Sequence, residues 1–214
     1  MSKKGIHIGI IADGNRRWAA KNNCGVSVGH HTGVNVIKKV LLPLIAKNSD
    51  IAEISIYLFS TENFSRAQSE KDELWKIFAE YEKTFENKEN FIIRHVGRTD
   101  RLPDFVIKGL HSLEQKTKNN DGQILNLCVD YSSEWEIDEA VKKGGIDYKE
   151  HFILSPFDLV IRTSGEKRLS NFAQRPIDGY AELYFTKTFF PAMTAVHFHA
   201  ALNDFKKRKT RRGK

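Results

Sequence analysis

The sequence lacks the features that mark exported, disulfide-bonded or membrane-spanning proteins. Only two of its 214 residues are cysteines, Cys24 and Cys128. Two are too few for a disulfide framework, and they suit a reducing compartment. No run of 18 apolar residues occurs, so no membrane-spanning helix is expected. The short apolar stretch before Asp13 does not resemble a signal peptide. We therefore expect a cytoplasmic protein whose contact with a membrane, if any, is peripheral.

Low-complexity tracts, internal repeats and breaks in composition are also lacking before the last nine residues. Hydrophobic residues make up 40% of the chain, which argues against general disorder. A chain of this length buries enough surface to need no disulfide or metal to hold its core. We expect one domain over residues 1–205, followed by a tail over residues 206–214.

The excess of positive charge is confined to that tail. The chain has 34 Lys and Arg against 27 Asp and Glu, a formal net charge of +7. Seven of the basic residues lie in 206–214, so residues 1–205 are formally neutral. Such a tail is either a solvated end or an arm that binds nucleic acid. A basic chain in general favours an anionic partner, which includes membrane surfaces and phosphorylated small molecules.

The apolar pattern predicts an α/β fold. Helical patterns over residues 32–47, with Pro43 as an expected kink, and over 72–85 alternate with short apolar runs rich in β-branched residues. This alternation favours a mostly parallel sheet flanked by helices. The runs predicted as strands are residues 6–12, 53–59, 91–96, 124–129 and 159–162.

The residues that follow these strands are rich in groups that bind phosphate. Open α/β sheets bind their ligands at the carboxyl ends of the strands. Four of the five segments found there carry arginine, serine or both. The most informative are residues 13–18, 60–66 and 163–171. The sequence therefore predicts a phosphate-binding site at this edge of the sheet.

The first of these segments combines a carboxylate, a glycine and two arginines. Gly14 lets a ligand approach the backbone, and Arg16 and Arg17 supply charge for a diphosphate. Asp13 beside them would suit a Mg²⁺ ion held between carboxylate and phosphate. The alternative is that Asp13 caps the following helix and pairs with Arg16 or Arg17. The residues alone leave both interpretations open.

Two further segments add anion-binding groups. His30 and His31 are adjacent on a predicted helix and so do not share a face, which makes a phosphate contact of His30 more plausible than a metal site. Residues 162–171 contain Arg162, Arg168 and Ser170, and arginine forks with serine hydroxyls are typical phosphate ligands.

The motifs together resemble the cis-prenyltransferases, the undecaprenyl diphosphate synthase family. The resemblance runs in order across nearly the whole chain, and it is carried by residues 8–18, 29–33, 57–66, 158–172 and 180–185. It implies a six-stranded sheet with an apolar tunnel for the growing chain. It also implies an enzyme that joins an allylic diphosphate to isopentenyl diphosphate with Mg²⁺. The chain lacks the aspartate-rich DDxxD motif of trans-type enzymes.

The resemblance assigns roles to individual residues. Asp13 would work with Mg²⁺ on the allylic diphosphate, and Glu182 would help to hold the metal. The residues implied to hold the allylic diphosphate are Gly14, Asn15, Arg16, Arg17, Trp18 and His30. Those implied to position the homoallylic substrate are Phe59, Ser60, Asn63 and Arg66, and those implied to bind its diphosphate are Arg162, Arg168 and Ser170. The implied catalytic residues are Asp13, Ser60, Asn63 and Arg66.

In relatives, an Arg-X-Gly at the end of the chain reaches the partner's isopentenyl diphosphate site in a homodimer. Arg211 and Gly213 match this motif in the tail. The resemblance thus makes a prenyl diphosphate, rather than a nucleic acid, the expected anion.

The chain departs from the family pattern in ways that affect substrate choice more than reaction class. Val26 stands where an arginine is expected, Arg16 where a small residue is usual, and Lys167 where bacterial enzymes often have histidine. The predicted helix 72–85 carries Trp75 and other aromatic residues that would fill a tunnel, so we expect a short product. The alternative meaning of these aromatic residues is an ordinary core.

Three other functions remain open at this point. A divergent member could join two dimethylallyl diphosphates in an irregular condensation of lavandulyl or cyclolavandulyl type. The tail could serve a nucleic-acid-binding protein, although the neutral body carries no RNA-binding motif. A catalytically silent partner subunit is disfavoured because Asp13 is present.

Overall fold

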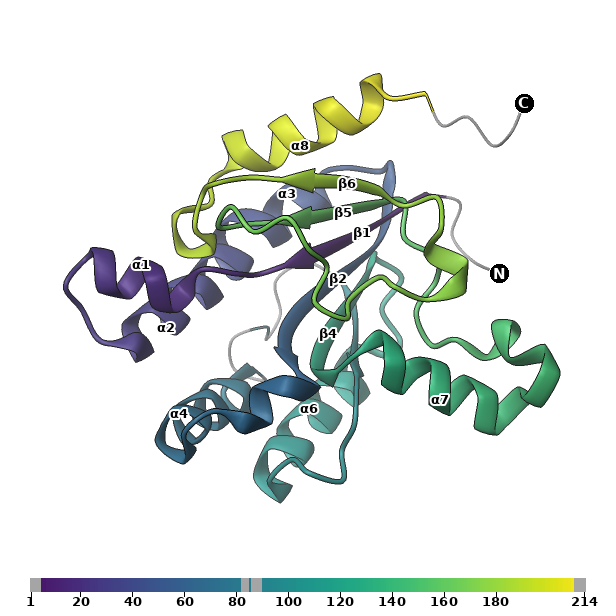
Figure 1. Cartoon of the computed structure of the whole chain (residues 1–214), viewed down its shortest axis with the longest axis horizontal. Helices are drawn as coiled ribbons and strands as arrows, with labels where there is room; N and C mark the ends of the chain where they lie inside the picture. Colours follow the sequence, from purple (N-terminus) through teal and green to yellow (C-terminus); the bar gives the residue numbers. More distant parts are fainter. Residues whose placement is uncertain (1–4, 82–84, 86–89, 210–214) are drawn as a thin grey trace.

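The computed structural model describes residues 5–81, Phe85 and residues 90–209. In this part of the chain, six strands form one sheet in the order β3-β4-β2-β1-β5-β6, and all of their pairings are parallel (Figure 1). The α/β prediction is confirmed. The strands are β1 Ile6–Ile11, β2 Ile51–Ser60, β3 Ile92–Val96, β4 Ile124–Tyr131, β5 Leu159–Arg162 and β6 Glu182–Phe185.

Helices cover both faces of the sheet, as parallel strands require. One core packs a face of the sheet against α2, α3, α4, α6 and α8. A smaller core on the other face includes Tyr57, Tyr131 and Phe172, with Trp135 of α7 packed against it. The helices are α1 Asn15–Lys21, α2 Val26–Val36, α3 Leu42–Ala46, α4 Gln68–Ala79, α6 Asp104–Thr117, α7 Ser133–Gly144 and α8 Ala195–Lys207.

The helix predicted over residues 32–47 has its irregular turn before Pro43, whereas the sequence predicted a kink at the proline itself. A π-helical turn over Ile37–Leu41 follows α2, and Pro43 lies in the first turn of α3. A proline ring clashes with the carbonyl four residues before it, which here is Lys39, inside the π turn. The wider turn thus precedes Pro43, and the chain continues as a helix through it.

The helix predicted over residues 72–85 is shifted toward the N-terminus. It begins at Gln68 and ends at Ala79. Tyr81 and Phe85 lie beyond its end but remain buried, at 1% and 6% exposure. The rest of the predicted helix, residues 82–84, lies outside the described residues.

The register of the strands decides which side chains reach the carboxyl edge. Ile11 of β1 lies beside both Tyr57 of β2 and Arg162 of β5, so Asp13 follows directly at that edge. On β6, Phe185 pairs with Arg162, whereas Glu182 pairs with Leu159 at the start of β5.

Candidate active site

A cavity of about 810 Å³ opens at the carboxyl ends of β1, β2 and β5. Most of the residues that the sequence predicted for the site line it. They are Asp13, Gly14, Asn15, Arg16, Arg17, His30, Phe59, Ser60, Asn63, Arg66, Arg162, Arg168 and Ser170. The fold therefore brings together side chains as far apart in the sequence as Asp13 and Ser170.

Four predicted site residues are not among those that line the cavity. Trp18 lies half-buried on α1. Glu182 begins β6 and accepts a 2.7 Å hydrogen bond from Nη1 of Arg208. Because Glu182 pairs with Leu159 rather than with Arg162, its role as a metal ligand stays a prediction that this placement does not support. Arg211 and Gly213 lie outside the described residues.

Asp13 is held between two arginines. Its Oδ1 accepts a hydrogen bond from Nη2 of Arg17 at 3.2 Å, and its Oδ2 accepts one from Nη2 of Arg162 at 2.9 Å. Burial alone would raise the pKa of Asp13, but Arg162 and Arg17 together hold it below its ordinary value. The carboxylate is therefore ionised and faces the cavity with two cations beside it.

Gly14 turns the chain sharply between β1 and α1. Its φ of +105° lies in the left-handed region that favours glycine. A Cβ atom at this position would lie 2.8 Å from both Phe189 Cδ1 and Ser164 Cβ. Any side chain here would displace the segment that carries Asp13, so the glycine is required by both conformation and space.

The group around Arg162 forms the second polar side of the cavity. Arg162 is 4% exposed. Its Nη1 donates to the hydroxyl of Ser170 at 2.8 Å and to the carbonyl of Arg168 at 2.5 Å. The side chain of Arg168 is 64% exposed and pairs with Glu166, which also pairs with Arg17. Glu166 thus links the first and fifth loops, a contact that the sequence did not reveal.

Glu70 is a site residue that the sequence analysis missed. This side chain of α4 is 16% exposed and lies 3.1 Å from Arg66. It also lies 3.8 Å from both Arg16 and His30. The opposite charges of Arg66 and Glu70, four residues apart in the sequence, were a signal that could have found this pair.

His30 is uncharged in this environment. Burial lowers its pKa to about 4, and the charges of Arg66 and Arg16 act in the same direction against the opposing effect of Glu70. A neutral imidazole can donate from one nitrogen and accept at the other. His30 can therefore give a hydrogen bond to an anionic ligand without carrying charge itself.

Three buried polar atoms near the cavity have no hydrogen-bond partner within the described chain. They are Asn15 Oδ1, His30 Nε2 and Arg162 Nε. A buried polar atom without a partner costs free energy, and such atoms at the wall of a cavity indicate a place where a ligand or water completes the bonding. All three residues line the cavity.

The side of the cavity formed by β2 is apolar at its base. Phe59 is 1% exposed and packs against Phe64, Trp75 and Phe78. Asn63 Oδ1 accepts a hydrogen bond from the backbone N–H of Ser60 at 3.2 Å. These contacts fix the turn after β2, so that Ser60, Asn63 and Arg66 face the same space.

Behind this site lies a cavity of only about 30 Å³, which has space for roughly two water molecules. Asn15 and His30 line both cavities, so the two adjoin. Phe78 and Tyr81 form part of its far wall, and the aromatic rings from Trp75 to Phe85 contact one another in sequence. Phe78 and Tyr81, two of the aromatic residues on the segment predicted to line a tunnel, thus border a cavity that is too small for a long prenyl chain.

Among the described residues, no group of three or more His, Cys, Asp or Glu side chains is arranged to hold a metal ion. No helix in the same part of the chain is long and apolar enough to cross a bilayer.

Comparison with known proteins identifies the family. The family described as "Putative undecaprenyl diphosphate synthase" matches residues 11–213. The chain belongs to this prenyltransferase family. It is 36% identical to an isoprenyl transferase of Treponema denticola, over 100% of this chain and 99% of the other. It is 37% identical to an isoprenyl transferase of Fusobacterium nucleatum, over 97% and 95% of the two chains.

Two solved structures of prenyltransferases are similar across the whole fold. Lavandulyl diphosphate synthase from Lavandula x intermedia, in complex with dimethylallyl diphosphate, superimposes with a TM-score of 0.89 at 27% identity over 100% of both chains. A probable undecaprenyl diphosphate synthase from Campylobacter jejuni gives a TM-score of 0.80 at 29% identity, over 97% of this chain and 98% of that one. The prediction of an enzyme that transfers prenyl groups is confirmed.

Proposed function

We propose that this prenyltransferase joins an allylic diphosphate to isopentenyl diphosphate and releases diphosphate and a short cis-prenyl diphosphate. One observation carries the proposal: a cavity rich in arginine adjoins an apolar pocket that aromatic rings close. The polar part suits two diphosphates, and a pocket of about 30 Å³ leaves no space for a long chain. Residues 1–205 would form a single catalytic domain.

The allylic diphosphate would bind at the first loop and α2. Arg17 offers charge there, and His30 offers a hydrogen bond, because its buried Nε2 has no partner within the described chain. Asn15 lines the same place. As the allylic C–O bond breaks, its electron pair passes to the leaving diphosphate. Cationic groups fixed beside that diphosphate stabilise the growing negative charge. Arg16 and Arg66 add charge at the rim of the same cavity.

The isopentenyl diphosphate would bind at the fifth loop. Arg162 and Ser170 are already oriented toward each other, and the exposed Arg168 can close over a phosphate. The terminal alkene carbon then bonds to the allylic carbon, and one proton leaves the isopentenyl unit. Phe59 and Asn63 lie where that unit would extend toward the first loop. Holding the two reactants together supplies much of the rate.

The side chains present fit a Mg²⁺ ion that enters with a substrate. Mg²⁺ is usually held by one or two carboxylates together with substrate phosphates. Asp13 is an ionised carboxylate that faces the cavity, and it would hold the ion jointly with the allylic diphosphate. Bound there, the ion would neutralise charge on the leaving group. Glu182, whose carboxylate pairs with Arg208, has no corresponding support.

Product analysis tests the reaction and the chain length together. Labelled isopentenyl diphosphate is incubated with Mg²⁺ and C5, C10 or C15 allylic primers, and the products are identified by mass spectrometry. We expect one or two additions and then termination. Long products would contradict the closed pocket, and no product with any primer would contradict the reaction.

An irregular condensation of two dimethylallyl diphosphates is the second candidate. Its support is the TM-score of 0.89 to a lavandulyl diphosphate synthase over the full length of both chains. Incubation with dimethylallyl diphosphate as the only substrate separates the two. A branched C10 diphosphate would favour the irregular reaction, and turnover only when isopentenyl diphosphate is added would favour the regular one.

We also propose a cytoplasmic homodimer in which Arg211 and Gly213 complete the partner's isopentenyl diphosphate site. The support is the match of the tail to the family motif. Deleting residues 209–214 should raise the KM for isopentenyl diphosphate and leave the dimer intact in sedimentation, because Arg208 and its ion pairs are retained. Unchanged kinetics would make the tail a solvated end. Salt-sensitive RNA binding that the deletion abolishes, without prenyl transfer, would favour a nucleic-acid function.

A further inference from the structure

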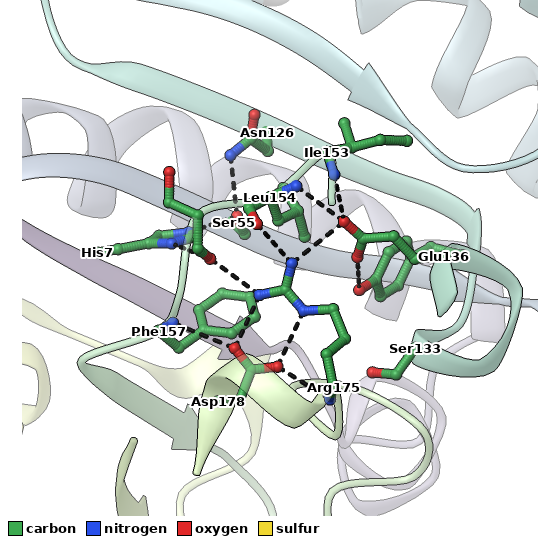
Figure 2. Close-up of polar contacts among 12 residues, drawn as sticks. His7, Ser55, Asn126, Ser133, Glu136, Ile153, Leu154, Phe157, Arg175 and Asp178 are labelled. Carbon is green, nitrogen blue, oxygen red and sulfur yellow. Dashed lines mark hydrogen bonds and ion pairs between the residues drawn. The ribbon is translucent and has the colours of Figure 1, made fainter. Parts of the chain in front are cut away.

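A second cluster of charged side chains lies fully inside the protein, away from the cavity (Figure 2). Arg175 and Glu136 have side chains that are 0% exposed, and that of Asp178 is 2% exposed. Arg175 forms a fork with Asp178 through Nε at 2.9 Å and Nη2 at 2.8 Å. Its Nη1 donates to Glu136 Oε1 at 3.1 Å. Burying one guanidinium and two carboxyl groups costs free energy of solvation, so the cluster needs a reason beyond filling space.

The cluster joins the chain just before β5 to the chain well after it. Arg175 Nη1 and Nη2 donate to the carbonyls of Leu154 and Ser155 at 2.5 and 2.9 Å. Asp178 accepts the backbone N–H of Phe157 at 3.3 Å. Residues 155–175, which include β5, therefore form a segment whose two ends are held together by the guanidinium group of Arg175 and its partners.

This segment carries the three described residues that were placed around the diphosphate of isopentenyl diphosphate. Arg162, Arg168 and Ser170 all lie within it. Ser170, Asn171 and Ala173 have φ values of 47°, 59° and 54°, a left-handed conformation that costs free energy for residues with a side chain. Such a backbone persists only where its surroundings hold it.

Two further contacts hold the same backbone from the α7 side. Ser133 accepts the N–H of Gln174 at 3.0 Å and donates its own N–H to the carbonyl of Asn171 at 2.7 Å. The hydroxyl of Tyr57 lies 3.2 Å from the carbonyls of both Tyr131 and Ser170. The Tyr131 hydroxyl in turn donates to Glu136 at 2.5 Å. The segment that contains the left-handed residues is therefore held both by contacts with α7 and by Arg175, which follows it in the chain.

We propose that Arg175 is a positioning residue for the transfer reaction, and that its buried fork sets the placement of Arg162 and Ser170 for the homoallylic diphosphate. This inference rests on the proposed function. A buried ion pair is a poor source of stability, because apolar residues of similar volume are often as good or better. The fork instead fixes the relative positions of the segments that it joins. The five N–H donors of Arg175 have a rigid geometry, and they bond to five oxygen atoms on three separate segments.

The groups placed around the allylic diphosphate depend less on residues 155–175. Arg17 bonds to Ser164 and Glu166 of this segment, but Asn15 lies on α1 and bonds to the carbonyl of Ala12, and His30 lies on α2. Loosening the Arg175 cluster should therefore affect one substrate more than the other, which a general loss of stability would not do.

The test compares Arg175→Lys with Thr117→Val. Thr117 is a buried hydroxyl on α6 that bonds to Ile93 N at 3.1 Å, remote from the cavity. In Arg175→Lys we expect the KM for isopentenyl diphosphate to rise roughly tenfold, with the allylic KM unchanged and kcat altered less. Thr117→Val should lower the melting temperature and leave both KM values unchanged. Rates are measured below both melting temperatures.

Asp178→Asn is a second variant that keeps Arg175 but weakens the fork, and it should show the same separation of KM values. Equal changes in both KM values, a change in melting temperature alone, or failure of both variants to fold would each overturn the inference in favour of a purely stabilising cluster. Calorimetric binding of isopentenyl diphosphate to the wild type and to Arg175→Lys needs no turnover. It therefore tests the positioning role even if the wild type forms no prenyl product.

Discussion

Two arginine–carboxylate clusters lie at opposite ends of β5. They are made of the same kinds of side chain but differ in exposure and in their bonding partners. At the carboxyl end, Asp13 and Arg17 have side chains that are 27% and 45% exposed. Just before the strand, Arg175 and Glu136 are fully buried. The first cluster borders a cavity and is surrounded by polar atoms without partners. In the second, side chains and backbone share the bonds among themselves.

The difference shows how the same side chains serve two purposes. An arginine that is partly open to water can exchange a carboxylate for a phosphate at little cost, because exposed ion pairs contribute little free energy. Arg175 cannot make that exchange, because all five of its N–H donors bond to oxygen atoms of the protein and removing a partner leaves an uncompensated buried charge. The open cluster is therefore suited to a ligand, and the buried one to holding the chain.

Removing the charge of the buried cluster should give the largest effect on stability. In Arg175→Met, Glu136 and Asp178 lose their counter-ion, so the free energy of unfolding should fall by about 3–5 kcal/mol. Adding Glu136→Gln and Asp178→Asn should restore part of it. Urea denaturation followed by circular dichroism measures the change. Arg98→Met, which breaks an exposed pair with Asp100, is the control, and an equally small loss in both would remove the contrast between the clusters.

Removing the carboxylate of the open cluster should affect activity instead. Asp13→Asn should lower kcat by about 10²–10³-fold, the range seen when one preorganised electrostatic group is lost, while the fold is retained. Steady-state kinetics and a thermal melt measure the two effects. Asp100→Asn, after β3, should keep full activity. Full activity of Asp13→Asn would take this carboxylate out of the reaction.

His30 should make the protein less stable in acid. The unfolded chain binds a proton to this histidine near pH 6.5, whereas the folded chain does so only near pH 4. The free energy of unfolding should therefore fall as the pH drops from 6.5 to 4, by at most about 3 kcal/mol. Denaturation at several pH values should show a smaller fall in His30→Gln than in the wild type. His31→Gln is the control, and identical pH profiles for all three would contradict the burial of an uncharged His30.

Glu70 should give the smallest effect and test how open the first cluster is. Its carboxylate lies among Arg16, Arg66 and His30, where it competes with a substrate anion. Glu70→Gln should lower the KM for the allylic diphosphate about two- to fivefold, which corresponds to less than about 1 kcal/mol. Glu73→Gln, one turn along the same helix and bonded to Ser27, should leave it unchanged. A higher KM in Glu70→Gln would mean that this carboxylate orients Arg66 instead.

The sequence predicted the open cluster better than the buried one. Asp13 directly follows one predicted apolar strand, and Arg162 ends another. Because the carboxyl ends of parallel strands meet at one edge of the sheet, local patterns were enough to predict that the two residues lie close together. Arg175 lies in an irregular segment, and its partners come from α7 and from the chain before β5. No periodicity indicates that such an arginine is buried, because charged residues are buried only when tertiary contacts pair them.

The same limit explains the errors in the helices. The apolar spacing of residues 72–85 continued past Ala79 because Tyr81, where the chain is helical again, and Phe85 are also buried. Hydrophobic periodicity reports burial and does not show the break at Glu80. Glu182 was assigned by resemblance alone, and only the register of β6 shows how far along the strand it lies from Arg162.

The π turn over Ile37–Leu41 determines where the helical segment after α1 can lose a residue. Each residue of an α-helix advances the chain by about 100° around its axis. A π turn closes its hydrogen bond over one residue more than an α turn, so the loss of one residue within Ile37–Leu41 can be absorbed when this turn becomes α-helical. Losing a residue between His30 and the turn would instead rotate His30 relative to the buried Leu42 and Ile45 by about that angle. Single-codon deletions before the turn should therefore reduce activity more than deletions within it.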